Sequence, residues 1–340
     1  MSQVAIVGAG AWGTALSIVL GRKRRHRVRL WAYEEQVRES IATRRENALF
    51  LPGEKIPDSV SVTGDLPDAL IAAEIVVSAM PSQHCRRLFE ETAALLSPEI
   101  LIVSATKGLE QATLLRMSEV ICQVTGQRCP VGALSGPSFA AEVARGDPTA
   151  ITIASKDALL ARNVQQEFSD PAFRVYTNDD LIGVELGGAL KNIIAIAAGV
   201  CHGLGLGNNS IAALITRGLA EITRLAVACG GRAQTMAGLA GLGDLVLTCT
   251  GALSRNRSVG VELGRGRKLP AIIDSMHGMV AEGVFTTDAA VHLARAQLVE
   301  MPITEQMHAI LNEGKSPRNA IHELMTRTSK SELHAASNPK

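Results

Sequence analysis

The chain has 340 residues, more than one hydrophobic core normally supports, so we expect about two domains. Hydrophobic residues make up 46% and charged residues 20%, a composition typical of a folded globular protein. Lys plus Arg number 34 against 33 Asp plus Glu, so no overall field recruits nucleic acid or an acidic membrane. Aromatic residues are only 3%, which favours helices packed over a parallel sheet through small and aliphatic side chains.

The sequence carries no clear signal of export, membrane insertion or metal binding. The N-terminus lacks a basic region with a small-residue cleavage site, and no run approaches about 18 uncharged apolar residues. The six cysteines form no CxxC pair and no metal-like group with histidine, so we expect reduced, mostly buried thiols. The basic cluster at residues 22–27 is interpreted as a solvated turn after a helix. These features predict a cytoplasmic protein without a metal site.

Apolar β-type runs alternate with helical stretches through the first part of the chain, which predicts a mainly parallel sheet with helices on both faces. The expected strands span residues 3–7, 27–31, 60–63, 74–80, 100–106, 131–136, 150–155 and 173–177. Later segments, rich in Ala, Leu and Ile, have the periodicity of helices. We therefore expect an α/β domain at 1–180, an all-helical domain at 181–326 that opens with a helix capped by Asn178 or Asp179, and a flexible tail at 327–340.

A glycine-rich turn follows the first strand and precedes a helical pattern. It reads GAGAWG, with Gly8, Gly10 and Gly13 spaced as GxGxxG around Ala11 and Trp12. The first glycine permits a tight turn, the second lets the backbone approach a pyrophosphate, and the third allows close packing of helix and strand. The helix N-terminus adds amide donors and a positive dipole. The turn predicts a dinucleotide-binding site in a Rossmann-like first domain.

The preference between NAD and NADP depends on the residues after the second strand. Glu34 and Glu35 lie 21 and 22 residues after Gly13, near the distance at which a carboxylate binds the ribose 2′-hydroxyl of NAD. Tyr33 is placed to stack on adenine. An exposed helix start also commonly carries Glu without any ligand. We predict NADH or NADPH as the cofactor, with a lean towards NAD.

Residues able to bind a substrate follow the later strands. Lys107 comes after the run ILIVSAT, and Gly136, Ser138 and Ala140 lie in SGPSFAAEV after another strand. Ligands of open α/β sheets bind at the carboxyl ends of strands, so we interpret Lys107 as a contact for an anionic or carbonyl substrate. Taken alone, a solvated loop lysine is the commoner case.

The second domain opens with an apolar run, residues 184–200, that carries a lysine at its middle. A buried ammonium costs several kcal/mol unless it is compensated, so Lys191 either extends to solvent or takes part in chemistry. Asp244 stands alone in GLAGLGDLVLTCTG, and Arg255 and Asn256 lie in SRNRS. Singly, Asp244 fits a helix cap and the RNR run fits a solvated face. Together they supply a proton carrier, a carboxylate to orient it, and donors suited to phosphate.

In this order the motifs resemble the bacterial NAD(P)-dependent glycerol-3-phosphate dehydrogenases over about residues 3–325. The matching segments are GAGAWGTAL, SATKGLE, SGPSFAAEV, GVELGGALKNIIAIAAG, NNSIAALITRGLAEI, GLAGLGDLVLTCTGALSRNRSVG and VAEGVFT. The resemblance implies a Rossmann-like domain, a helical domain and a homodimer. It also implies a reversible hydride transfer between NAD(P)H and C2 of dihydroxyacetone phosphate, giving sn-glycerol 3-phosphate for phospholipid synthesis.

The resemblance implies roles for individual residues. Lys191 is implied as the proton donor and acceptor at the C2 oxygen; burial and Lys107 are expected to lower its pKa, and Asp244 to oppose this. The implied substrate contacts are Lys107, Gly136, Ser138, Lys191, Asp244, Ser254, Arg255 and Asn256, supported by Asn192 and Thr248. The implied cofactor contacts are Gly8, Gly10, Ala11, Trp12, Gly13, Tyr33, Lys107, Ala140, Arg255, Val280 and Glu282.

One position departs from the family pattern. Many bacterial members carry an arginine just after the second strand, where this chain has Tyr33 and Glu34, closer to NAD-using eukaryotic relatives. Two alternatives stay open. A β-hydroxyacid dehydrogenase has a similar build, although SRNRS favours a phosphate over a carboxylate substrate. A catalytically silent dinucleotide sensor has no need for Lys107, Lys191 and Asp244 together.

Overall fold

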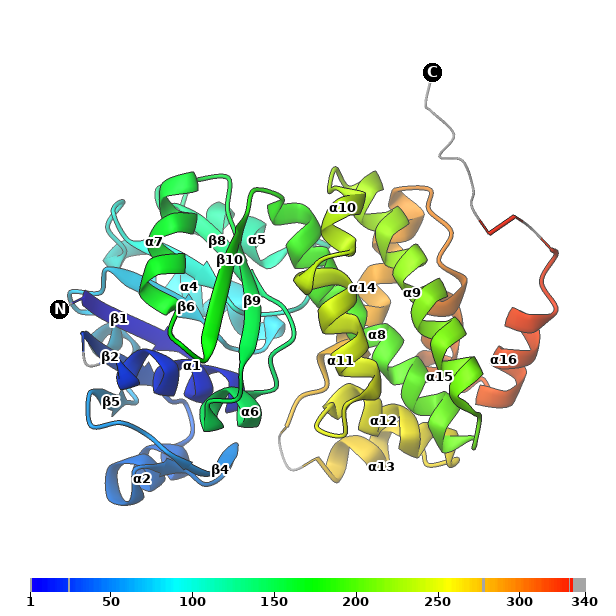
Figure 1. Cartoon of the computed structure of the whole chain (residues 1–340), viewed down its shortest axis with the longest axis horizontal. Helices are drawn as coiled ribbons and strands as arrows, with labels where there is room; N and C mark the ends of the chain where they lie inside the picture. The colour runs from blue at the N-terminus through cyan, green and yellow to red at the C-terminus, as the bar shows by residue number, and fades with distance from the viewer. Residues whose placement is uncertain (1, 24, 277–278, 330, 333–340) are drawn as a thin grey trace.

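The computed structural model describes residues 2–23, 25–276, 279–329 and 331–332, which form an α/β domain followed by a helical domain (Figure 1). The change from one to the other falls between strand β10 (Phe173–Asn178) and helix α8 (Leu181–Gly203). The expected fold class is confirmed: a mainly parallel sheet with helices, then an all-helical part.

Within the described residues, eight strands form one sheet in the order β10-β9-β8-β7-β6-β1-β2-β5. Neighbouring strands are parallel except β8 and β9, in which Leu134 lies opposite Ile153 in an antiparallel register. A short antiparallel pair, β3 and β4, was not predicted from the sequence. The other strands are β1 (Ser2–Val7), β2 (His26–Trp31), β3 (Glu46–Asn47), β4 (Leu51–Lys55), β5 (Val60–Thr63), β6 (Ile75–Ser78), β7 (Leu101–Ser104), β8 (Val131–Ser135) and β9 (Thr149–Ala154).

Both faces of the sheet are buried under helices. Along β1, Val4 and Ile6 belong to one apolar cluster with helices α1, α6 and α7, while Ala5 and Val7 belong to another with α3, α4 and α5. Successive strand residues point to opposite faces, which explains the near-continuous apolar runs of the sequence. The helices are α1 (Ala11–Arg22), α2 (Glu35–Arg44), α3 (Leu66–Leu70), α4 (Cys85–Thr92), α5 (Met117–Val124), α6 (Ala140–Arg145) and α7 (Ala158–Phe168).

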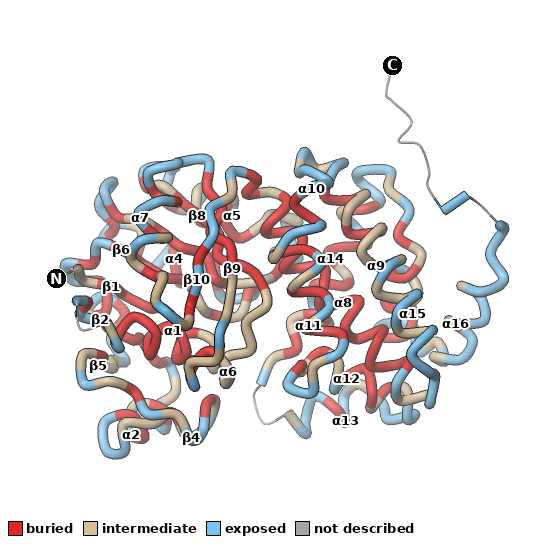
Figure 2. Tube along the Cα trace, viewed as in Figure 1, coloured by how far each residue is buried: buried red, intermediate tan, exposed pale blue. Residues whose placement is uncertain are grey.

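Helix α8 forms the centre of the helical domain and is buried along nearly its whole length (Figure 2). It is long and apolar enough to cross a membrane, but the other helices of the chain cover it, as in a core helix. The surrounding helices are α9 (Asn208–Ala228), α10 (Ala233–Met236), α11 (Asp244–Thr250), α12 (Arg255–Gly264), α13 (Leu269–Asp274), α14 (Glu282–Ala296), α15 (Pro302–Asn312) and α16 (Pro317–Met325).

Helices α8 and α12 approach each other closely because glycines line their contact. A Cβ atom at Gly260 would lie 1.9 Å from the carbonyl oxygen of Ile196, and one at Gly199 would lie 2.0 Å from that of Arg257. Real Cβ atoms do not approach so closely, so larger residues would force the helices apart. This contact holds α12, which begins at Arg255, against the middle of α8.

The cap predicted for α8 was wrong by one or two residues. Asn178 still belongs to β10, and the exposed Asp179 side chain pairs with Arg232 instead. The capping residue is Asp180, whose buried carboxylate accepts a hydrogen bond of 2.9 Å from the backbone amide of Gly183. The cap therefore sits two residues beyond Asn178, the last paired residue of β10.

Four residues of the basic cluster bind carbonyl groups of the α/β domain, namely Arg22, Lys23, Arg25 and His26. The Lys23 ammonium donates to the carbonyl of Glu167 at 2.6 Å, and Arg25 donates to that of Gln166 at 2.6 Å. These carbonyls lie at the C-terminal end of α7, where cations compensate unpaired acceptors and the helix dipole. Arg24, in this cluster, and residues 333–340 of the expected tail lie outside the described residues.

The six cysteines are free, and four of them are buried, as expected.

Candidate active site

A cavity of about 1090 Å³ lies between the two domains. Its wall on the α/β side consists of the segments that follow β1, β2, β6, β7 and β8, together with part of the β3–β4 hairpin. Strand β1 lies between β2 and β6, so the connections leave it towards opposite sides of the sheet, and ligands of such folds bind at this point. The opposite wall comes from α8, α11 and the starts of α12 and α14.

The glycine-rich turn has the shape of a dinucleotide cradle. Gly8 has a φ of +116°, and a Cβ atom there would lie 2.8 Å from the Ala79 carbonyl group. At Gly13 a Cβ would lie 1.9 Å from the Gly8 oxygen, whereas at Gly10 it would meet open space. Nearby, the buried Trp12 Nε1 has no hydrogen-bond partner among the described residues. The open approach at the N-terminus of α1 therefore fits the pyrophosphate of a dinucleotide cofactor.

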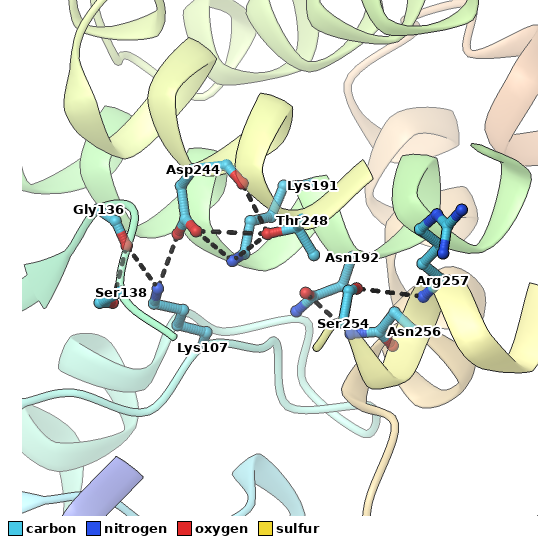
Figure 3. A network of polar contacts seen from close by, with 10 residues as sticks. All are labelled: Lys107, Gly136, Ser138, Lys191, Asn192, Asp244, Thr248, Ser254, Asn256 and Arg257. Atoms are coloured by element: carbon cyan, nitrogen blue, oxygen red, sulfur yellow. Dashed lines mark hydrogen bonds and ion pairs between the residues drawn. The ribbon is translucent and has the colours of Figure 1, made fainter. Parts of the chain in front are cut away.

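Two lysines from different domains converge on one buried carboxylate (Figure 3). Asp244 accepts hydrogen bonds from Lys191 through Oδ1 and from Lys107 through Oδ2, the latter at 2.7 Å. Lys191 also donates to Thr248 Oγ1 at 2.8 Å, and the Thr248 hydroxyl donates to the Asp244 carbonyl at 2.6 Å. Lys191 is only 7% exposed yet forms part of the cavity wall, so it does not extend to bulk solvent.

Burial and the neighbouring charges act on this cluster in opposite directions. Burial lowers the pKa of Lys191 to about 8; the Asp244 carboxylate acts to raise the pKa and the Lys107 ammonium to lower it. Burial acts to raise the pKa of Asp244, but the two ammonium groups outweigh it and the pKa is lowered. Asp244 is thus a carboxylate at neutral pH, and Lys191 changes its charge near pH 8.

A second group of polar side chains lies at the start of α12. Asn256 Oδ1 accepts a hydrogen bond of 3.0 Å from the Gly283 amide, which leaves its Nδ2 to donate to Asn192 Oδ1 at 3.0 Å. This chain of bonds fixes Asn192 with its amide donors still available at the cavity wall. Arg255 also lies in the wall, and its guanidinium has no hydrogen bond or ion pair to any described residue. Burial lowers the pKa of Arg255.

Most of the residues singled out from the sequence meet at this cavity. Those in its wall are Gly8, Gly10, Ala11, Trp12, Tyr33, Lys107, Ser138, Ala140, Lys191, Ser254, Arg255, Asn256, Val280 and Glu282. Gly13, Gly136 and Asp244 lie behind the wall; the Gly136 carbonyl accepts from Lys107 Nζ at 3.1 Å and from the Ser138 hydroxyl at 2.9 Å. Ser254 caps α12 through the Arg257 amide.

Sequence reasoning missed part of the wall. Phe50, Leu51 and Pro52 reach it from the β3–β4 hairpin, and Gln83, His84 and Arg87 reach it from the segment after β6. The segment SAMPSQH, residues 78–84, lies at the carboxyl end of the strand expected at 74–80, where ligands of open α/β sheets bind, and this was a signal for the second group. The hairpin gave no comparable signal, because its two short strands lack an alternating pattern.

The fold and the cavity together define an NAD(P)-dependent oxidoreductase of two domains, and comparison with known proteins identifies its family. Residues 3–161 match the family model for the N-terminus of NAD-dependent glycerol-3-phosphate dehydrogenase, and residues 180–322 match the model for its C-terminus. The chain therefore belongs to the NAD(P)-dependent glycerol-3-phosphate dehydrogenases. This membership decides against the hydroxyacid dehydrogenase and the silent sensor, and it establishes a small-molecule substrate.

Individual relatives agree with the family models. Glycerol-3-phosphate dehydrogenase (NAD(P)+) of Koribacter versatilis is 67% identical over 335 residues, covering 98% of this chain and 99% of the relative. The protein of the same description from Acidobacterium capsulatum is 57% identical, covering 98% and 100%. The crystal structure of glycerol-3-phosphate dehydrogenase from Coxiella burnetii superposes with a TM-score of 0.92 at 41% identity, covering 96% of this chain and 99% of that one.

Proposed function

We propose that the cavity binds dihydroxyacetone phosphate and NAD(P)H, and that Lys191 gives a proton to the C2 oxygen as C2 is reduced. The observation that supports this most directly is a buried ammonium in the cavity wall, held by Asp244 and Thr248. An ammonium has three N–H donors, so one remains for the substrate oxygen. The nicotinamide, when bound, supplies the hydride. In the reverse direction neutral Lys191 accepts the hydroxyl proton of sn-glycerol 3-phosphate.

Asp244 and Lys107 support this proton transfer. The Asp244 carboxylate keeps Lys191 oriented and offsets part of the cost of burying its charge. The Lys107 ammonium pairs with the same carboxylate. While Lys191 is protonated, the group of Lys107, Lys191 and Asp244 therefore has a net positive charge. A positive site next to the substrate carbonyl polarises it and stabilises the negative charge that develops on oxygen. We place Gly136 and Ser138 on the substrate side of the cavity. The Gly136 carbonyl accepts hydrogen bonds from both the Ser138 hydroxyl and the Lys107 ammonium, so all three residues lie together.

Arg255 is the proposed phosphate ligand. A half-buried guanidinium without a partner among the described residues fits an anionic group supplied by the substrate. Asn192 offers amide donors nearby, oriented by Asn256, and Ser254 lies beside them in the wall. This arrangement favours a phosphate over a smaller uncharged group, because unpaired polar donors in the wall penalise substrates that lack a matching acceptor.

The remaining wall residues are proposed to bind the cofactor. Gly8, Gly10, Ala11, Trp12 and Gly13 form the cradle for the pyrophosphate at the start of α1. The other proposed cofactor contacts in the wall are Ala140, Val280 and Glu282. Lys107 and Arg255 also lie in the wall, and we assign them to both the cofactor and the substrate.

We propose that the enzyme prefers NADH to NADPH. Tyr33 and Glu34 lie in the wall at the end of β2, where the adenine ribose of a dinucleotide binds. The nearby Arg38 donates through Nη1 to the carbonyls of Ala32 and Tyr33, at 2.9 and 2.7 Å, and packs against Gly64. Nη1 of this arginine is therefore engaged with the backbone, and Arg38 does not belong to the cavity wall, whereas Glu34 does. Repulsion between the 2′-phosphate of NADPH and the Glu34 carboxylate disfavours that cofactor.

The test is NADH and NADPH oxidation with dihydroxyacetone phosphate, on the unmodified protein and on Lys191→Met, which removes the charge and keeps the volume. Loss of a general acid predicts a fall in kcat of at least about 10²-fold with cofactor binding retained. Lys156→Met, at an exposed lysine, is the control and is expected to match the unmodified protein. Failure of the unmodified protein to turn over this substrate overturns the proposed reaction, and full activity in Lys191→Met overturns the role of the lysine.

We further propose that the protein is a cytoplasmic homodimer that works in phospholipid synthesis. Family membership supports the role in lipid metabolism, because acylation of glycerol 3-phosphate requires this product. Helix α8 is buried within its own subunit along most of its length, so a subunit contact is expected to involve other parts of the chain. Light scattering on the purified protein and fractionation of cells test the two statements, and a monomer or a membrane-bound fraction contradicts them.

A further inference from the structure

Two serine–glutamate pairs of the same geometry join the two domains. Ser82, after β6, donates from its backbone amide and its hydroxyl to Glu282 at the start of α14, at 3.1 and 2.6 Å. Ser118, in α5, donates from its amide and hydroxyl to Glu185 in α8, at 2.8 and 2.6 Å. The pairs differ in place: Glu282 forms part of the cavity wall, whereas neither Ser118 nor Glu185 does.

The Ser82–Glu282 pair touches the cofactor-binding domain at the segment that carries Lys107. A Cβ atom on Gly108 would lie 2.6 Å from Ser82 Oγ and 3.1 Å from Glu282 Oε2, so this glycine leaves the space that the pair needs. Burial raises the pKa of Glu282, and the hydrogen bonds from Ser82 act against this rise. The charge on Glu282 therefore depends on its bonds across the domain boundary.

The same pair is tied to the substrate side through the next residue of α14. The Gly283 amide donates to Asn256, and Asn256 donates to Asn192, both at 3.0 Å. A Cβ atom on Gly283 would lie 2.8 Å from both Asn192 O and Asn256 Oδ1. The start of α14 is thus packed directly against the two amides. A shift of the Glu282 backbone relative to Ser82 moves Gly283, the next residue, and with it the amide that orients Asn192.

We propose that the Ser82–Glu282 pair couples cofactor binding to substrate binding. Ser82 is a positioning residue. It holds Glu282 and therefore the start of α14, whose Gly283 amide orients Asn256. Asn256 in turn orients the amide donors of Asn192. A dinucleotide in the cavity contacts both domains, and so it stabilises the arrangement in which this pair is formed. That arrangement is the one that presents Asn192 to the substrate, so each ligand tightens the binding of the other by the same factor. This inference rests on the function proposed for the cavity.

The coupling is measured as the ratio of two dissociation constants of NADH, without and with saturating glycerol 3-phosphate. Both compounds are in the reduced form, so no turnover disturbs the titration. Trp12 and Trp31 lie in the cavity wall and report binding by their fluorescence. We expect glycerol 3-phosphate to tighten NADH binding to the unmodified protein. Ser82→Ala is expected to reduce this factor by about tenfold, in line with one hydrogen bond to a charged group.

Ser118→Ala is the control, because it removes a hydroxyl from a second pair between the domains, away from the cavity; its Glu185 carboxylate is held by Arg116 as well. It is expected to lower thermal stability as Ser82→Ala does while keeping the coupling factor of the unmodified protein. Gly108→Ala separates Ser82 from Glu282 by steric contact and is expected to reduce the factor as well, which provides a second test if Ser82→Ala does not fold.

Three results overturn the inference: no coupling in the unmodified protein, an unchanged factor in Ser82→Ala, or an equal loss in Ser82→Ala and Ser118→Ala. An equal loss in the two variants would mean that both pairs only hold the domains together and that neither has a specific part in the coupling. The proposed function is judged separately, by oxidation of NADH with dihydroxyacetone phosphate in the unmodified protein.

Discussion

Replacement of Asp244 by Asn removes one charge from the centre of the lysine pair while the side-chain volume is kept. Asp244 is 1% exposed, and each of its carboxylate oxygens accepts from a different ammonium group, Lys191 or Lys107. In Asp244→Asn two positive charges share a buried site without a carboxylate between them. Loss of a proton from Lys191 then relieves the repulsion, so its pKa falls.

The size of this fall follows from the contacts. Burial lowers the pKa of Lys191 to about 8 even with Asp244 acting to raise it. A hydrogen bond to a charged group contributes about 1.5 to 3 kcal/mol, and one pH unit corresponds to about 1.4 kcal/mol, so the pKa in the variant is expected at about 7 or lower. At pH 7.5 the protonated fraction of Lys191 then drops from about three quarters to about one quarter or less.

The assay is kcat/KM for dihydroxyacetone phosphate across about pH 5.5 to 9.5. In the proposed mechanism reduction requires protonated Lys191, so its rate falls as pH rises through the pKa. Oxidation of glycerol 3-phosphate requires the neutral amine, so its rate rises through the same range. In Asp244→Asn both midpoints move down by at least about one pH unit. Asp58→Asn, at a fully exposed position, leaves them in place. An active Asp244→Asn variant with an unchanged or higher midpoint refutes the reasoning.

Three further predictions follow from single contacts. Arg255→Gln is expected to lower kcat/KM for dihydroxyacetone phosphate by about 10- to 100-fold, by loss of a charge-assisted hydrogen bond, while unphosphorylated dihydroxyacetone is affected little; equal losses for both compounds argue against a phosphate contact. Gly260→Ala, whose Cβ would lie 1.9 Å from Ile196 O, is expected to cost about 1 to 3 kcal/mol of unfolding free energy in denaturant titrations, and Gly207→Ala, in open space, is expected to cost much less. Glu34→Gln is expected to lower the ratio of kcat/KM for NADH to that for NADPH, whereas Glu35→Gln on the adjacent exposed position keeps it; an unchanged ratio in Glu34→Gln refutes the proposed repulsion.

Some features followed from the sequence because each depends on a few neighbouring residues. The requirement for glycine at Gly8 and Gly13 arises within one turn, from a positive φ at Gly8 and from the contact between Gly13 and the Gly8 carbonyl. The buried strands were recognisable because a sheet covered on both faces needs apolar residues at successive positions. The hairpin β3–β4 was not, since a strand of two residues and the segment LPGEK show no period. The cap of α8 was misplaced because three adjacent polar residues are all suitable caps, and only the length of β10 selects Asp180.

Short segments of the sequence were enough to predict a dinucleotide turn, a mainly parallel sheet and a lysine in an apolar helix. The partners of that lysine emerge only in the folded chain, since Asp244 and Lys107 reach it from segments 53 and 84 residues away. The bridge between Ser82 and Glu282 spans 200 residues and left no local pattern at either end. Contacts of this kind depend on how whole elements pack, and packing sums many distant apolar contacts that no short segment of the chain records.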